Sequence, residues 1–181
     1  MRVIGLLLAA LPLFVASRAR AEGDELLRGP FPFLNENELS VHAGYAVGLG
    51  QAPSGTRAQV DYGLALQRGP WVDIQMGMVA GHCAGDCGAE GGKSVDVLAG
   101  LKWKFQTSVP VVPYGKLAVG PVFLFPDDAS NTAGFLVRGA VGAHYFFNHW
   151  LGLGAEISGA TGYASGALGS LDFTLGAEFQ F

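Results

Sequence analysis

The chain has 181 residues, of which 50% are apolar and 14% are charged, and its mean hydropathy is +0.33. This composition is too apolar for an average soluble domain, yet no internal run of 18 or more apolar residues occurs, which excludes a protein built from transmembrane helices. The acidic net charge of −4 without basic runs disfavours nucleic-acid binding, and 28 glycines disfavour long helices.

Residues 1–21 have the pattern of a secretory signal peptide. Arg2 opens the segment, an apolar stretch follows, and Ala19-Arg20-Ala21 fits an A-x-A cleavage site. Without the three arginines of this segment, the net charge of the mature chain becomes 8 minus 15, or −7. Residues 22–38 contain two prolines and no clean period, so we expect a periplasmic lead segment. It is either a disordered linker or a short element that plugs the mouth of the fold formed by the residues after it.

Eight segments of alternating polarity follow the lead segment. They cover residues 39–49, 57–67, 71–81, 94–105, 111–125, 135–147, 151–158 and 171–181. Because successive side chains of a strand point to opposite faces, each segment predicts a strand with one apolar and one polar face. Pro113 and Pro121 each remove a backbone donor from the fifth segment, which predicts bulges or frayed ends there.

The last segment, Leu171 to Phe181, alternates without a slip and ends on an aromatic residue. In this it resembles the final strand of bacterial outer-membrane β-barrel proteins. The resemblance implies an all-β fold, a closed eight-stranded antiparallel transmembrane β-barrel formed by residues 39–181, in the outer membrane of a Gram-negative cell. It also implies that Phe173, Phe179 and Phe181 form the signal read by the barrel-assembly machinery. Outer-membrane lipids are the other expected partner, and we expect a monomer without cofactors.

The polar face of the eight segments predicts the barrel interior. It carries eleven charged residues: Arg57, Asp61, Asp73, Asp96, Lys102, Lys104, Lys116, Arg138, Glu156, Asp172 and Glu178. Most strand glycines share this face, whereas only Gly115, Gly139 and Gly159 lie on the apolar one. A narrow eight-stranded lumen needs small residues and a water-facing exterior does not, so the polar face points inward. We expect these charges to pair and seal the lumen.

The connections between the predicted strands also alternate in length. Those after the second, fourth and sixth segments are short, whereas residues 50–56, 82–93, 126–134 and 160–170 form longer loops. Bacterial barrels have short periplasmic turns and longer external loops, so both termini are expected in the periplasm and the longer loops outside the cell. Trp71, Trp103 and Trp150 lie beside the short turns and are expected to form an aromatic girdle.

Cys83 and Cys87 lie close together in a predicted external loop. In a secreted chain this spacing predicts a short local disulfide. Two alternatives remain open, a metal site that adds His82 and Asp86, or a free dithiol.

Three functions are compatible with these features. The favoured one is a non-enzymatic structural or surface-interaction barrel, similar to the OmpA and OmpX-like families, that acts through its loops. Transport of small or hydrophobic solutes is the second, since Val79 and Leu98 on the inward face permit an apolar gap. A lipid-modifying enzyme is the third, because Glu156, Ser158 and His144 supply an acid, a nucleophile and a base.

Overall fold

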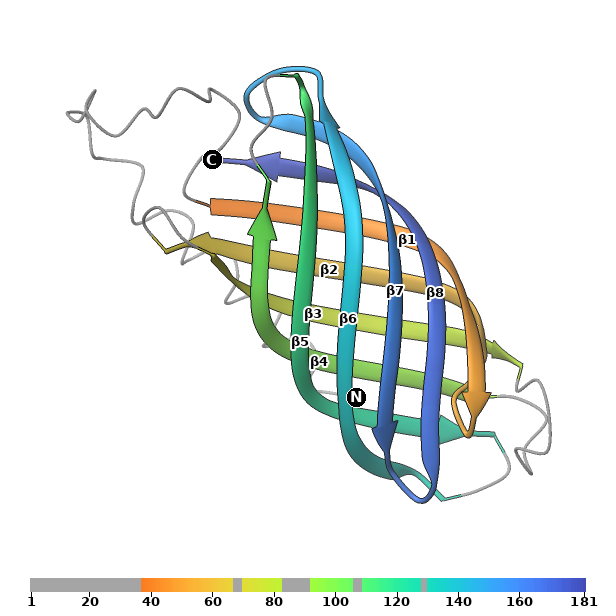
Figure 1. The fold of residues 1–181 in the computed structure, drawn as a ribbon. Helices are drawn as coiled ribbons and strands as arrows, with labels where there is room; N and C mark the ends of the chain where they lie inside the picture. Colours follow the sequence, from red (N-terminus) through yellow and green to blue (C-terminus); the bar gives the residue numbers. More distant parts are fainter. Residues whose placement is uncertain (1–36, 67–69, 83–91, 106–108, 128–129) are drawn as a thin grey trace, which may run out of the picture. The chain divides into compact units, whose positions relative to one another are not determined.

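The computed structural model describes residues 37–66, 70–82, 92–105, 109–127 and 130–181. These residues form eight antiparallel strands: β1 (Asn37–Gly50), β2 (Ser54–Ala65), β3 (Trp71–His82), β4 (Gly92–Lys104), β5 (Val111–Pro126), β6 (Thr132–Phe146), β7 (Leu151–Tyr163) and β8 (Ala167–Gln180). Each strand pairs with the next and β8 pairs with β1, so the sheet closes into a barrel (Figure 1). The predicted closed eight-stranded antiparallel barrel is therefore confirmed. No helix in the described ranges is long and apolar enough to cross a membrane.

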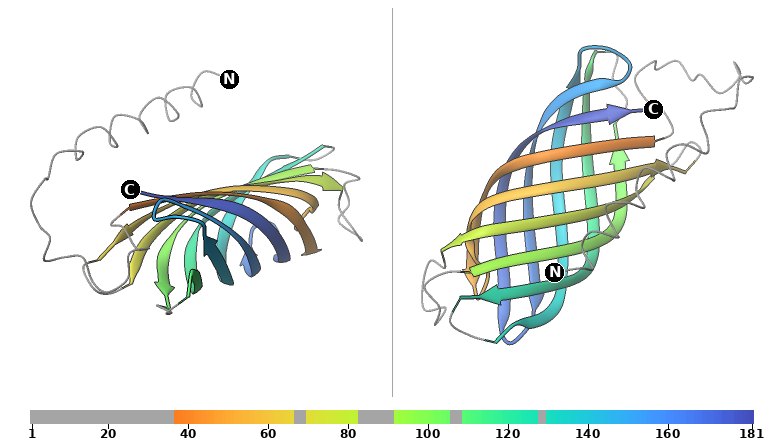
Figure 2. Two further views of the ribbon diagram at one scale, coloured as in Figure 1. Left: turned by 90° about the horizontal axis from the view of Figure 1, so that it is seen from above. Right: turned by 180° about the vertical axis from the view of Figure 1, so that it is seen from behind.

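The register of the ladders sets the tilt of the strands. Following hydrogen-bonded neighbours around the barrel from Leu39 leads back to β1 at Leu49, a shear of ten residues. With the usual rise per residue and strand spacing, this shear on eight strands gives a tilt of about 40°. The two walls of the barrel therefore cross at a steep angle, as Figures 1 and 2 show.

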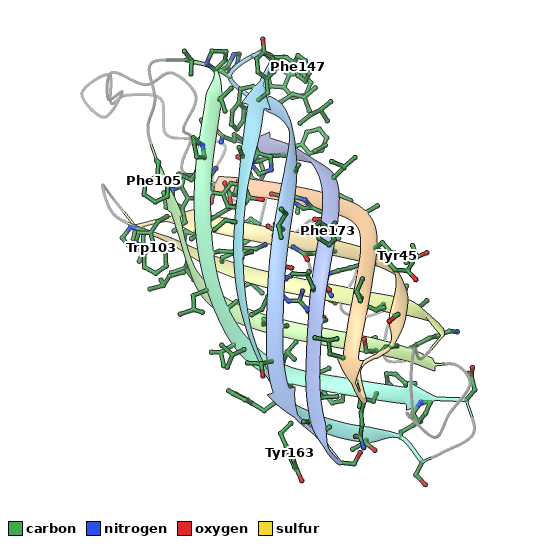
Figure 3. All side chains as sticks on the ribbon, turned by 45° about the vertical axis from the view of Figure 1, so that its right-hand side comes forward. Tyr45, Trp103, Phe105, Phe147, Tyr163 and Phe173 are labelled. Atoms are coloured by element: carbon green, nitrogen blue, oxygen red, sulfur yellow. The ribbon has the colours of Figure 1, made fainter. Side chains whose placement is uncertain are left out.

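Alternation separates two chemically different faces on every strand. On β8, Leu175 points outward with 70% of its surface exposed, whereas Asp172 and Glu178 point inward and are 0% exposed. Aromatic side chains such as Tyr45 and Phe173 project away from the barrel (Figure 3). The outward positions of the described strands are apolar or small, and charge occurs among them only at Lys93 near the start of β4. This is the surface expected of a barrel that faces lipid.

Two connections are shorter than the sequence predicts. The β1–β2 and β7–β8 connections are residues 51–53 and 164–166, because the Gly, Ser and Thr residues expected in loops continue the ladders, as in the Thr161–Gly169 pair. The β6–β7 connection at the other end, residues 147–150, is longer. The predicted contrast of long and short connections is thus wrong for these two turns. Gly50 permits the first of them with a φ of 67°, a conformation that other residues avoid.

The prolines of β5 do not produce the predicted bulges. β5 pairs with β6 in unbroken register from Val111 to Leu124, and the Pro113 carbonyl accepts a hydrogen bond from the Phe105 amide at 2.8 Å. The β4–β5 register is also constant. Backbone pairing between these two strands is interrupted where Val97 and Leu98 face Pro121 and Gly120. Each proline points outward and removes one donor without adding a residue, so the strand stays in step.

The barrel begins two residues earlier than predicted. Asn37 and Glu38, assigned to the lead segment, are the first residues of β1, and the Asn37 amide donates to the Phe181 carbonyl at 3.1 Å. Phe181 donates back to Asn37 at 3.0 Å, so both ends of the described chain meet on one rim. Residues 1–36, which hold the expected signal peptide and most of the lead segment, lie outside the described ranges.

Candidate functional site: the barrel interior

The interior holds every charged residue that the sequence placed there. All eleven side chains are at most 4% exposed. Buried charges are stable only when they are paired and hydrogen-bonded, so their partners decide what the interior can do. The pairs fall into three clusters along the barrel axis.

The arginine cluster lies in the half of the lumen away from the termini. It joins Arg57 of β2, Asp96 of β4, Arg138 of β6 and Asp172 of β8, so every second strand contributes one residue. Arg57 contacts Asp96 at 3.1 Å and Asp172 at 3.4 Å, and Arg138 contacts Asp96 at 3.4 Å and also pairs with Asp172. Charges of opposite sign therefore alternate around a closed ring, which neutralises all four groups.

The middle cluster is centred on Lys116 of β5. Its ammonium contacts Asp61 and Glu156 at 2.9 Å each, and the Tyr114 hydroxyl donates to Glu156 at 2.9 Å. Gln59 connects this cluster to the arginine cluster, because its amide nitrogen donates to Asp61 at 2.9 Å while its oxygen accepts from Arg57 at 3.0 Å. The two clusters consequently form one hydrogen-bonded network.

The lysine cluster fills the end nearest the termini. Lys102 donates to Glu38 at 2.6 Å, Lys104 donates to Glu178 at 2.6 Å, and Lys104 also pairs with Glu38. The Lys102 ammonium lies 4.7 Å from the centre of the Tyr114 ring, which links this cluster to the middle one. The ion pairs thus extend through most of the lumen.

Two histidines lie over glycines on neighbouring strands, His42 beside Asp61 of the middle cluster and His144 beside Glu178 of the lysine cluster. A Cβ on Gly176 would come within 2.5 Å of His42 Nδ1, and one on Gly154 within 2.2 Å of His144 Cδ2. The ring centres of His42 and His144 are 5.8 Å apart. Glycine on the inward face therefore makes room for imidazole rings, which explains part of the glycine bias seen in the sequence.

Beside the arginine cluster, and beyond it away from the termini, the interior becomes apolar. Leu98, Ala118, Val122, Leu124, Leu136, Ala160 and Leu168 form the apolar luminal cluster, and the turn residues Ala52 and Ala164 pack against it. A cavity of about 30 Å³ adjoins this cluster, lined in part by Val79, Leu136 and Arg138. That volume holds about two water molecules. The inward positions of Val79 and Leu98 agree with the sequence analysis.

Some buried polar groups have no protein partner in the described part of the chain. Both carboxylate oxygens of Asp73 and both amide atoms of Gln75 lack a hydrogen bond there, and neither side chain is exposed. Asp73 and Gln75 both belong to β3, and Asp61 faces Gln75 across the β2–β3 ladder. The three side chains therefore lie on one wall of the barrel. The described residues contain no group of three or more His, Cys, Asp or Glu arranged to hold a metal ion. Cys83 and Cys87 lie outside these residues.

The three candidate catalytic residues are not brought together. Ser158 belongs to the arginine cluster, where it accepts from Arg138 at 3.1 Å and donates to Asp172 at 3.3 Å. His144 lies beside Glu178 of the lysine cluster, at 3.0 Å. Ser158 pairs with Ala140 on β6, four residues from His144, which is about 13 Å along the strand. Hydrogen bonding between this serine and this histidine is excluded.

Trp71 does not belong to the predicted girdle. It is 5% exposed and points into the lumen, where the Lys104 ammonium lies 4.3 Å from its ring centre. The reason is parity, since Trp71 shares the inward face of β3 with Asp73. Trp103 does point outward, together with Phe105 and Phe147 near the same rim (Figure 3), and Trp150 is also exposed. Phe173 and Phe179 lie on the outer face of β8, and Phe181, the residue after this strand, is also exposed.

Sequence reasoning missed Glu38 and Tyr114. Glu38 is 0% exposed and binds two lysines, but it precedes the first segment with visible alternation. Glu38 lies two residues before Ser40, which faces inward, so strand alternation predicts that Glu38 faces inward as well. Tyr114 is 2% exposed, and its position between Pro113 and Gly115 obscured its parity.

Solved structures with the same architecture come from outer-membrane proteins. Neisserial surface protein A superposes with a TM-score of 0.67 at 15% identity, covering 81% of this chain and 98% of that one. The N-terminal β-barrel domain of Pseudomonas aeruginosa OprF gives 0.53 at 14% identity, with 81% and 100% covered. The outer membrane enzyme PagL gives 0.51 at 13% identity, with 80% and 99% covered. The chain therefore has the fold of the eight-stranded outer-membrane barrels.

No protein-family model matches the chain, and no curated protein matches it. At these identities the structural similarity concerns the fold alone, so function has to be argued from the interior and the surface.

Proposed function

We propose that this protein is a structural or surface-interaction barrel of the Gram-negative outer membrane whose lumen is closed to solutes. The observation that carries this proposal is the filling of the interior by three connected ion-pair clusters and an apolar cluster. An eight-stranded barrel has room only for its own side chains, and here they contact one another across the lumen. Action through the loops and the lipid-facing wall is then the remaining route.

The proposed location and orientation rest on several features. The outward faces are apolar, outward aromatic residues occur near both rims, and the fold is shared with outer-membrane proteins. The meeting of Asn37 and Phe181 on one rim places both ends of the barrel on one side of the membrane, which we assign to the periplasm. The partners proposed are outer-membrane lipids and the barrel-assembly machinery, with the barrel as a monomer.

Conductance tests the closed lumen. The purified protein is inserted into planar bilayers, and a channel-forming porin in the same membrane serves as the control that current is measurable. We expect no steady conductance from this barrel. A reproducible open channel would overturn the proposal and make transport the leading function.

Transport of small hydrophobic solutes is the second candidate, favoured by the apolar luminal cluster and its cavity. The arginine cluster lies beneath this apolar region and obstructs passage along the axis. Uptake of a labelled hydrocarbon by cells with and without the protein tests it, and equal uptake argues against this candidate.

The proposed role is non-catalytic, even though PagL is an enzyme by name. Support comes from the separation of Ser158 and His144 into different clusters. Purified barrel incubated with lipopolysaccharide and phospholipid should leave the acyl chains of both unchanged by mass spectrometry. A new acylated or deacylated product would contradict the non-catalytic role.

A further inference from the structure

One ladder of the barrel is interrupted, and the place is specific. Among the pairs of described strands, only β4–β5 has an internal gap, where Val97 and Leu98 face Pro121 and Gly120. Proline has no amide hydrogen, so residue 121 cannot supply its ladder bond. In lipid no water replaces a missing backbone partner. This seam therefore lacks a backbone hydrogen bond that nothing in the surrounding lipid can replace.

The inner side of the seam is apolar. Leu98, 1% exposed, lies directly opposite Gly120, which has no side chain. A Cβ on Gly120 would come within 2.2 Å of the Val97 carbonyl oxygen, so no larger residue fits there. Leu98 therefore covers the inside of the gap without a facing side chain. Rotation of this one side chain would uncover it.

The apolar luminal cluster and its cavity both adjoin the seam. Leu98 and Val122 belong to the cluster, and Val122 also lines the cavity. Val122 pairs with Asp96 in the last rung before the gap. Much of the rest of the described lumen is occupied by charged and polar clusters, with further buried apolar side chains at Trp71, Val112 and Phe146. Arg57, Asp96 and Arg138 of the arginine cluster also line the cavity, so the interrupted seam borders both the apolar luminal cluster and these ion pairs.

The outer side of the seam faces the hydrocarbon of the membrane. Val97 is 39% exposed and Pro121 is also exposed, and the outward neighbours Val119 and Phe123 are apolar. No charged side chain is among these outward residues. The molecules next to this wall are consequently lipid chains and compounds dissolved among them.

We propose that the apolar luminal cluster is a binding site for the end of a hydrocarbon chain, which enters sideways from the membrane between β4 and β5. The cavity of about 30 Å³ accommodates only the last one or two carbons. This site is independent of the closed lumen, because a chain end that enters through the wall opens no path for ions along the axis.

Photolabelling in vesicles tests the proposal. One arm uses a phospholipid whose acyl chain carries a terminal diazirine, and the other uses a free diazirine-bearing alkane, so that the arms separate lipid chains from dissolved hydrocarbons. Labelled peptides are mapped by mass spectrometry. In the wild type we expect labelling of the inward residues Leu98, Val122 and Leu136 as well as of outward residues such as Val119.

The decisive variant is Pro121→Val, which restores the amide hydrogen on an outward position. We expect inward labelling to fall several-fold while outward labelling is unchanged. Pro113→Val is the matched control, because it makes the same change on the same face of β5 outside the gap and should leave inward labelling as in the wild type. Heat-modifiable migration on gels verifies that each variant is folded.

A reversible second variant covers the case in which Pro121→Val misfolds. Ala99→Cys with Val119→Cys, in a background of Cys83→Ser and Cys87→Ser, places two cysteines across the rung beside the gap and keeps Pro121. Inward labelling should fall on oxidation and return on reduction, whereas a Val119→Cys and Val137→Cys pair on β5–β6 should have no effect. Absence of inward labelling in the wild type, or inward labelling that oxidation does not change, would overturn lateral entry.

Discussion

Arg57 and Arg138 approach the same carboxylate oxygen, Oδ2 of Asp96, from opposite walls of the barrel, at 3.1 and 3.4 Å. The strands that carry them, β2 and β6, are as far apart around the barrel as two of its strands can be. Both guanidinium groups also reach Asp172. This contact across the lumen ties the walls together and makes the arginine cluster the strongest constraint on the interior.

Truncation of Arg138 should destabilise the barrel. Arg138→Ala leaves Asp172 and Asp96 with less compensation inside a closed lumen, and breaking such a buried pair costs about 3 to 5 kcal/mol. Urea unfolding of the protein refolded into lipid vesicles measures the change. Lys93→Ala, at an exposed position near the start of β4, is the control and should be near neutral. Equal midpoints for the two variants would contradict the structural role of the cluster.

Glu38 should matter although it precedes the predicted barrel. Glu38→Gln keeps the shape of the side chain but leaves Glu178 to compensate both Lys102 and Lys104. Loss of a charged hydrogen-bond partner in the interior is expected to cost about 2 kcal/mol in the same unfolding assay. Asp127→Asn, on an exposed connection, is the matched control. A wild-type midpoint for Glu38→Gln would show that the first strand contributes little to the lysine cluster.

Two glycines should respond oppositely to the same substitution. In Gly100→Ala the new methyl group would lie 2.1 Å from the Leu117 carbonyl oxygen, so we expect a loss of about 1 to 3 kcal/mol. In Gly139→Ala it would meet nothing within 4 Å, and stability should be unchanged or rise by up to about 1 kcal/mol. Unfolding midpoints compare the two. A larger loss for Gly139→Ala than for Gly100→Ala would show that the inward and outward faces are misassigned.

Removal of Phe181 should impair assembly more than export. The residue belongs to the proposed assembly signal, and its backbone closes the rim by two hydrogen bonds with Asn37. The truncated protein is expected to reach the periplasm but to yield little folded barrel, as measured by heat-modifiable migration of membrane fractions. Phe147→Ala, another outward aromatic residue near that rim, controls for the loss of a ring. Wild-type migration of the truncated protein would argue against the signal.

The cysteine pair should be dispensable for folding. If Cys83 and Cys87 form the predicted disulfide, the ring is small, and its entropic contribution is at or below the roughly 3 kcal/mol expected for a 15-residue loop. Replacement of both by serine should leave the barrel folded. Thiol labelling on intact cells without a reductant should be negative in the wild type, and clear labelling would refute the bridge.

Much of the fold was predictable because a strand in a lipid-facing wall must alternate. The eight segments, their faces and the eleven inward charges follow from this period of two. The predictions were wrong where the alternation of polarity was weak, or where residue type was given more weight than alternation. Trp71 was assigned by residue type to the membrane interface, although its parity with Asp73 directed it inward. Gly- and Ser-containing stretches such as Ala167–Ser170 have the composition of loops, but their backbone groups pair as well as those of any other residue.

The sequence by itself therefore determined which side chains face the lumen, because parity is a local property of each strand. It could not determine their partners. Arg57 meets Asp96 and Asp172, and Lys116 meets Asp61 and Glu156, only after closure with a shear of ten residues brings distant strands to the same height. Register and closure are properties of the whole ladder, so the division into three clusters, the histidines above their glycines and the apolar region beside Pro121 were decided by the tertiary structure alone.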